Sequence, residues 1–135
     1  MKETILSIAG RPGLYKLISH GRGNLIVETI DATKKRLPAG VRDRVTALND
    51  VSMYTTEDDV SLLQVFQNLS DKHQGAAIEL NHKQASEQEL RAMMTDALPN
   101  YDEDRVHISD MRKLLQWYNI LATNGYAKFV EEEEK

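Results

Sequence analysis

The first part of the chain alternates short apolar runs with glycine-rich turns. The runs that predict strands are residues 5–9, 14–20, 25–30, 36–39 and 51–55. Turns are expected at 10–13 and 21–24, because glycine reaches unusual φ values and proline restricts φ. Pro38 favours a sheet edge for its run, since proline donates no ladder hydrogen bond. Residues 45–48 fit either a short strand or a helical turn.

The second part of the chain changes to a helical period. Thr56 and the acids that follow it predict the start of a helix that runs to about His73, with Leu62, Phe66 and Leu69 on its apolar face. The capping-box pattern of residues 86–89 predicts a second helix that ends before Pro99. Ser109 is the expected cap of a third helix, which stops at 124–125.

The predicted fold class is therefore α+β. Five short strands with tight turns in about 55 residues predict a small SH3-like five-stranded β-barrel at residues 1–55. A three-helix C-terminal half is expected at 56–130, with an acidic disordered tail at 131–135. The strands are apolar on both faces, so one barrel face needs to be covered. The sequence alone does not identify that face. Units this small are marginal alone, so we expect the halves to pack together.

Charge divides the chain in the same way as the pattern does. Residues 1–50 contain nine Lys and Arg against five Asp and Glu, whereas residues 51–135 contain eight against sixteen. The total of −4 conceals this asymmetry. A basic strand-rich unit joined to an acidic helical one favours binding over catalysis.

The basic residues of the first half are interleaved with aromatic rings. The basic set is Arg11, Lys16, Arg22, Lys34, Lys35, Arg36, Arg42 and Arg44. The candidate ligand-binding residues are Lys16, Arg22, Lys34, Lys35, Arg36, Tyr15 and Tyr54. Small barrels that bind single-stranded RNA combine such cations with stacking rings, and an acidic protein segment fits the same cations. The pI of 5.6 counts against non-specific binding to nucleic acid.

The alternative is a structural protein or a homo-oligomer without a role in nucleic-acid binding. In that case the cations are solvated turn residues, or they dock onto acids of the same chain or of a second copy. Lys34, Lys35 and Arg36 would then face Asp58, Asp59 or the acids at 102–104.

The sequence contains few of the residue patterns that are typical of catalytic or metal sites. We therefore expect no enzyme, cofactor or metal site. The chain has no cysteine, and its four histidines share no metal-ligand spacing. The acids from Asp102 onward do not form a Ca²⁺ loop, because the sixth position lacks glycine and the twelfth is Lys113. His107 beside Asp110 lacks an obvious nucleophile. Neither a signal peptide nor a membrane span is apparent, so the expected location is the cytoplasm.

Four stretches together resemble a known family. They are ILSIAGRPGLYKL at 5–17, DVSMYT at 50–55, LPNYDEDRV at 98–106 and KLLQWYN at 113–119. With these stretches the chain resembles a family of short Bacteroidetes proteins that is described as a domain of unknown function. The resemblance covers almost the whole length, and LPNYDEDRV is its most specific part. It implies a cytosolic bacterial protein and assigns no catalytic residue.

Overall fold

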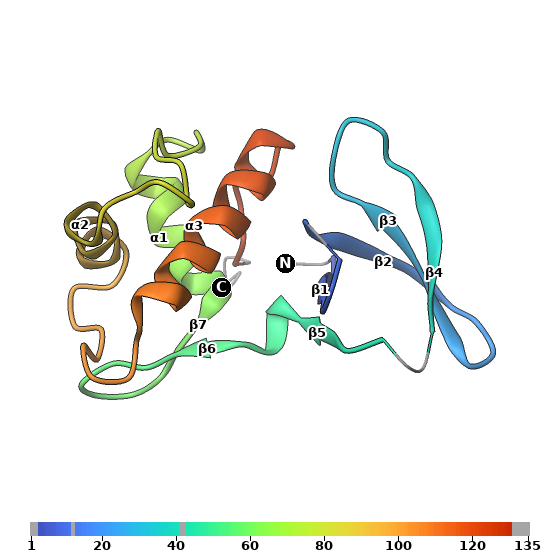
Figure 1. The fold of residues 1–135 in the computed structure, drawn as a ribbon, viewed down its shortest axis with the longest axis horizontal. Coiled ribbons are helices and arrows are strands. Elements are labelled where there is room, and N and C mark those ends of the chain that lie inside the picture. Colours follow the sequence, from blue (N-terminus) through green and yellow to red (C-terminus); the bar gives the residue numbers. More distant parts are fainter. Residues whose placement is uncertain (1–2, 12, 41–42, 131–135) are drawn as a thin grey trace, which may run out of the picture.

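The structure is a computed structural model that describes residues 3–11, 13–40 and 43–130. In this part of the chain a β-sheet is followed by three α-helices, which confirms the predicted α+β class. The sheet and the helices lie side by side (Figure 1). The elements in chain order are β1 (Ile5–Ile8), β2 (Tyr15–His20), β3 (Asn24–Thr29), β4 (Arg36–Gly40), β5 (Val45–Ala47), the 3₁₀ turn η1 (Leu48–Asp50), β6 (Ser52–Met53), β7 (Val60–Ser61), α1 (Leu62–Lys72), α2 (Glu87–Ala97) and α3 (Ile108–Thr123).

The main sheet is antiparallel, with strand order β4-β3-β2-β1-β5. Strands β1 to β4 form a meander in which each strand pairs with the next along the chain. The predicted hairpin turns are confirmed. Gly13 and Gly23 adopt φ values of 79° and 73° in these turns, a region that disfavours residues with a Cβ.

The run predicted as a fifth strand at 51–55 does contain a short strand, β6, but that strand lies outside the main sheet. Strand β5 takes its place in the main sheet, with Ile8 opposite Val45 and Leu6 opposite Ala47. The apolar side chains of β5 thus cover those of β1, and the next residue, Leu48, is fully buried among the helices. The chain has therefore left the sheet before residue 51. Strand β6 instead pairs with β7 in a separate two-stranded ribbon.

The apolar side chains on one face of the main sheet pack against one another. Its interior cluster contains the buried residues Leu6, Ile8, Tyr15, Val27 and Ala39, with Leu17, Leu25, Leu37, Val45 and Ala47 packed against them. All five strands contribute, and no helical residue joins the cluster. Within the described strands no pairing connects β4 to β5, so the ring of hydrogen bonds required for the predicted closed barrel is not present.

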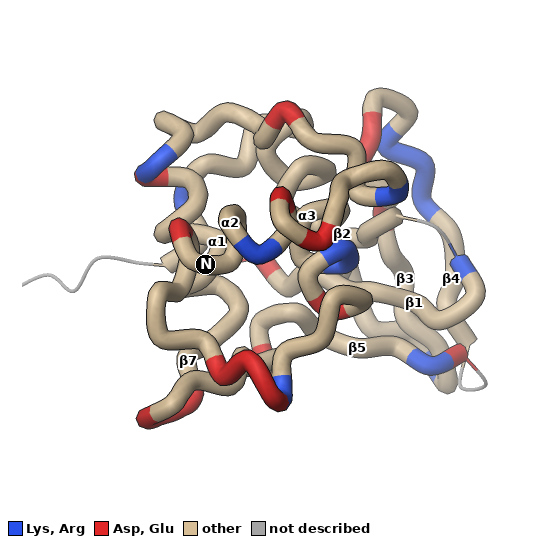
Figure 2. The backbone as a smooth tube through the Cα atoms, turned by 60° about the vertical axis from the view of Figure 1, so that its left-hand side comes forward, with Lys and Arg blue, Asp and Glu red and all other residues tan. Residues whose placement is uncertain are grey.

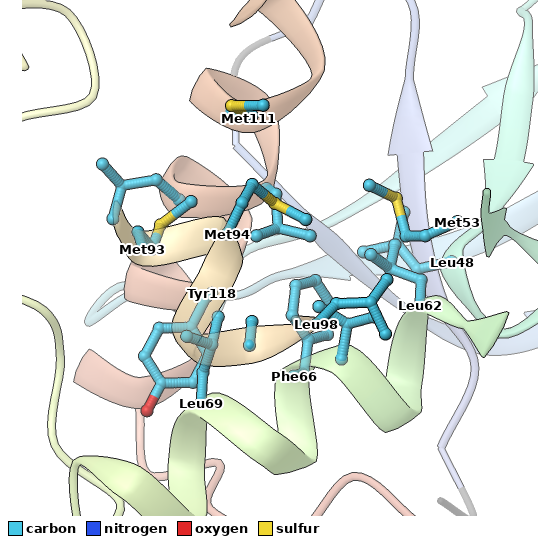
Figure 3. Packing of buried hydrophobic residues seen from close by; sticks show 14 of the residues in the cluster. Leu48, Met53, Leu62, Phe66, Leu69, Met93, Met94, Leu98, Met111 and Tyr118 are labelled. Atoms are coloured by element: carbon cyan, nitrogen blue, oxygen red, sulfur yellow. The ribbon is translucent and has the colours of Figure 1, made fainter. Parts of the chain in front are cut away.

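The larger core lies among the helices and reaches into the sheet half. Phe66, Tyr118 and Phe129 pack against one another in it as tilted rings, with ring centroids 5.5 to 6.3 Å apart. Figure 3 shows the surrounding leucine and methionine side chains, including Leu48 and Met53. The ends of the sheet strands supply Ile5, Leu14 and Ile30 to this core. The two halves therefore pack together, as the sequence predicts.

Helix starts were predicted with mixed success. The capping box is confirmed: the Ser86 hydroxyl accepts from the Glu89 N–H, and the Glu89 carboxylate accepts from the Ser86 N–H. The predicted start of α1 at 56–59 is wrong, because β7 intervenes and Ser61 is the cap. The predicted Ser109 cap is also wrong, since α3 begins after His107.

No helix in the described residues has the length and apolar character needed to cross a membrane. The acidic tail predicted at 131–135 lies outside the described residues.

Candidate functional site

The structure divides the basic residues into two groups at opposite ends of the sheet. Arg22 precedes the start of β3, whereas Lys34 and Lys35 follow its end. A strand of this length spans roughly 20 Å, so one ligand group does not touch both ends. The group facing the helical half contains Lys16, Lys34, Lys35 and Arg36. The far group contains Arg22 and Arg44, and the Arg11 side chain reaches it through Asp43. Arg42 lies outside the described residues.

In the group that faces the helices, a carboxylate lies beside Arg36 and Lys16, whereas Lys34 and Lys35 form no ion pair with a described residue. Glu28 lies opposite Arg36 in the sheet, and its Oε2 is 3.1 Å from Arg36 Nε. Lys16 is the partner of Glu28 on the next strand. Asp31 Oδ1 accepts hydrogen bonds from the Thr33 and Thr29 hydroxyls and from the Lys34 N–H. These bonds, with those from the hydroxyls dominant, hold the Asp31 pKa below its usual value, so this carboxylate remains charged.

The two candidate tyrosines do not form a stacking surface beside these cations. Tyr15 is only 6% exposed and packs inside the sheet, so its predicted role as a stacking platform is not compatible with the structure. Tyr54 is 43% exposed but belongs to the helical half. Its ring is covered by the Arg105 guanidinium, 4.2 Å from the ring centroid.

We call the far end of the sheet the basic end (Arg11, Arg22 and Arg44), where Arg11 is paired with Asp43. Here a shallow depression of about 400 Å³ is lined by Gly21, Gly23, Asn24, Leu25, Ala39, Gly40, Asp43 and Val45. Asp43 is the only carboxylate in that lining, and its Oδ2 already accepts from Gly40 N–H at 2.7 Å and from Arg11 Nη2 at 3.3 Å. Arg22 and Arg44 are exposed and form no ion pair with any described residue.

Acidic residues gather at the opposite end of the molecule, which we call the acidic end (residues 57–59 and 102–104). A bridge between Thr55 and Tyr101 joins these two loops, and the Asp102 N–H donates to the Tyr54 carbonyl. The basic β3–β4 turn lies far from them (Figures 1 and 2). The predicted pairing of Lys34–Arg36 with these acids within one chain is therefore wrong. Only pairing between two copies remains open.

A broad cleft of about 660 Å³ separates the sheet from α3. Its lining mixes apolar and polar residues, and two of the polar side chains help to hold the structure together. Asn119 binds the Ile78 backbone at both atoms of its amide, and Asn124 Nδ2 donates to the Ile30 carbonyl. Tyr126 lines a different pocket, where its hydroxyl donates to Glu3 Oε2 at 2.6 Å. Burial, followed by this bond, raises the Tyr126 pKa.

The described residues do not assemble a cluster of metal ligands. No group of three or more potential ligands from His, Asp and Glu comes together among them. Asp110 Oδ2 accepts from the backbone N–H of His107 at 3.0 Å, so this carboxylate caps α3.

Sequence reasoning missed a smaller pocket of about 210 Å³ between β6 and α3, the Trp117 pocket. Its lining is Val51, Ser52, Met53, Tyr54, Leu62, Arg105, Val106, Asp110, Lys113, Leu114 and Trp117. The neighbour of Trp117 in sequence, Tyr118, is instead fully buried in the helical core. The available signal was the spacing of Asp110, Lys113, Leu114 and Trp117, which puts them on one side of a helix.

Comparison with known proteins divides the chain near the end of η1. Residues 51–121 match a family described as Domain of unknown function (DUF6852). The chain belongs to this family. Residues 3–48 match a second family, Domain of unknown function (DUF5606). Each half of the DUF6852 protein thus has its own family description, and neither description assigns an activity.

A solved structure supports this assignment over the whole chain. A solution NMR structure of a protein from Bacteroides vulgatus, a structural-genomics target, is 50% identical in sequence. The match covers 100% of this chain and 99% of that one, with a TM-score of 0.80. No curated protein matches the chain. The resemblance to an uncharacterised Bacteroidetes family is therefore confirmed.

Proposed function

We propose that this protein is a non-enzymatic binding module whose basic end takes an acidic protein segment. One observation carries the proposal: Arg22 and Arg44 are exposed without ionic partners beside a depression whose only carboxylate is already engaged. Guanidinium groups bind carboxylates through paired, charge-assisted hydrogen bonds. The surrounding glycines leave room for another backbone to approach closely.

RNA is the less favoured partner. Single-strand binding depends on bases stacking on exposed rings, and none of the described residues that line the depression at the basic end is aromatic. The acidic end also repels a long polyanion. A short acidic segment needs no stacking surface, and it contacts the basic end without extending to the acidic end.

The architecture behind this surface is, in our proposal, a small barrel of SH3-like type. Its support is the interior cluster, in which Leu37 and Ala39 of β4 and Val45 and Ala47 of β5 pack against the same residues. These strands are the two edges of the sheet, so the sheet must curve strongly to bring them together. We also propose a cytoplasmic location, because a chain without cysteine fits a reducing compartment.

Fluorescence anisotropy with a labelled oligoglutamate peptide and a labelled mixed-sequence RNA tests the partner. The variant Arg22→Gln/Arg44→Gln removes charge at the basic end, and Lys34→Gln/Lys35→Gln removes the same charge at the other end of β3. We expect the arginine variant to weaken peptide binding at least about fivefold, because it removes two charge-assisted contacts. The lysine variant should change it less than about twofold.

Equal losses in both variants would mean that only net charge matters and would refute a specific basic end. RNA that binds more tightly than the peptide at physiological ionic strength would transfer the proposal to nucleic acid. Absence of any peptide binding at low salt would reject it altogether.

A structural role is the second candidate, and the separation of the basic and acidic ends favours it. A molecule with opposite charges at its two ends can associate head to tail, in contacts that do not close by twofold symmetry. Sedimentation at low and high salt tests this. Association is expected to increase with protein concentration at low salt and to disappear at high salt, and a monomer at all salts would exclude it.

A further inference from the structure

The Trp117 pocket lies on the helical half, away from the basic end, and its floor is apolar. Met53, Leu62 and Leu114 are buried beneath it, and Figure 3 shows Met53 and Leu62 side by side. The pocket volume is about 210 Å³. An apolar cavity of about 150 Å³ suffices for benzene, so this pocket admits a body as large as an aromatic ring.

The outer wall of the pocket is held in place before any ligand arrives. The Arg105 guanidinium covers the Tyr54 ring, and Arg105 Nε lies 3.0 Å from Asp102 Oδ2. Asp102 Oδ1 in turn accepts from the Asp104 N–H at 2.9 Å. The hydrogen bond from Arg105 is the largest cause of a lowered Asp102 pKa, followed by the one from Asp104. A wall that is already ordered costs little further entropy on binding.

Among the charged residues of the lining, Arg105 is paired with Asp102, which lies outside the lining. Asp110 accepts from the His107 N–H as the cap of α3 and keeps its charge. Lys113 is exposed and forms no ion pair with any described residue. An apolar body that carries one negative charge satisfies both the floor and this lysine. We propose that the Trp117 pocket binds a small organic acid with an apolar body, such as an aryl carboxylate.

The expected affinity is modest. A ligand of this size makes few contacts, and the neighbouring acidic end opposes the approach of an anion. A Kd on the order of 1 mM for a single-ring acid is therefore expected. This site uses other residues than the basic end does, so it stands or falls independently of the proposed function.

The pocket contains its own reporter, because Trp117 is the only tryptophan of the chain. Titration of the full chain with phenylacetate should change the tryptophan fluorescence saturably. The uncharged phenylacetamide, which has the same ring, should bind about threefold more weakly because it lacks the contact with Lys113. Amide NMR shifts should move at 51–54 and 105–117 with both compounds.

The variant Lys113→Gln should abolish the preference for the acid over the amide while leaving amide binding unchanged. Lys83→Gln, an exposed lysine outside the pocket, is the matched control and should retain the preference. Equal binding of acid and amide by the native chain would overturn the role of Lys113. A linear, non-saturating signal up to about 20 mM phenylacetate, without localised NMR shifts, would overturn the site itself.

Discussion

The interior of the sheet and the core among the helices differ in where their residues come from. The sheet interior is built by strand residues alone, from Leu6 on β1 to Ala47 on β5. The helical core takes residues from both halves, including Ile5 and Leu14 beside Phe66. The two halves therefore contribute unequally. The helical core contains side chains from the sheet half, whereas the sheet interior contains no side chain from the described helices.

This difference teaches how two units with separate family descriptions form one protein. The apolar ends of the sheet strands are covered only when the helices are present. Polar contacts join the same surfaces, with Asn124 Nδ2 3.3 Å from the Ile30 carbonyl and Tyr126 bonded to Glu3. We therefore expect one cooperative unfolding transition.

Truncation is the most severe test of the comparison. A fragment of residues 1–56 exposes Ile5, Leu14, Ile30 and Leu48, which are buried in the full chain. It should be poorly folded or aggregate, because this apolar surface would meet water. The full chain under the same conditions is the control for the amide NMR spectrum and the thermal melt. A well-dispersed spectrum with a sharp melt from the fragment would show two independent modules.

The same substitution in the two clusters compares their packing. Leu69→Ala removes a fully buried side chain of the helical core, and Leu6→Ala removes one from the sheet interior. We expect a loss of about 4 kcal/mol in the free energy of unfolding for Leu69→Ala and about 2.5 kcal/mol for Leu6→Ala. The sheet interior is smaller and collapses more easily around a void. Urea unfolding measures both, and an equal or reversed order would contradict the comparison.

Helix capping is encoded locally, unlike closure of the sheet, and two serines test this. Ser86→Ala should cost about 1 kcal/mol, because the Ser86 hydroxyl accepts the Glu89 N–H at 3.1 Å. Ser109→Ala should cost less than about 0.3 kcal/mol, since α3 is capped at His107. Chemical denaturation of both variants gives the comparison. A large loss at Ser109 would show that the helix begins later than the structure places it.

The smallest effect concerns the turn after β3. The Asp31 pKa is lowered by hydrogen bonds, so its charged form favours the folded turn at a pH above the ordinary value of 3.8. That contribution is lost as the pH falls through the lowered pKa. An NMR titration should give an Asp31 midpoint below 3.8, and Thr33→Ala should raise it. Thr46→Ala on β5 should leave the midpoint unchanged, and a midpoint unaffected by Thr33→Ala would contradict the assignment.

Much of the fold is readable from local signals. The strand before and after each glycine turn, the edge position of Pro38 and the Ser86 capping box all follow from neighbours within a few residues. The prediction failed where a partner distant in sequence decided. Residues 45–47 became the fifth strand because Leu6 and Ile8 lie opposite them, and β7 displaced the start of α1 because β6 pairs with it.

The candidate site shows the same division more sharply. The sequence by itself determined the charge of each half and the types of residue available for binding. Only the tertiary structure decided that Tyr15 is buried, that Arg22 and Lys34 lie at opposite ends of one strand, and that Tyr54, Lys113 and Trp117 share a pocket. The physical reason is range: turns and caps depend on hydrogen bonds between near neighbours, whereas burial and pockets depend on which distant segments meet when apolar surface leaves water.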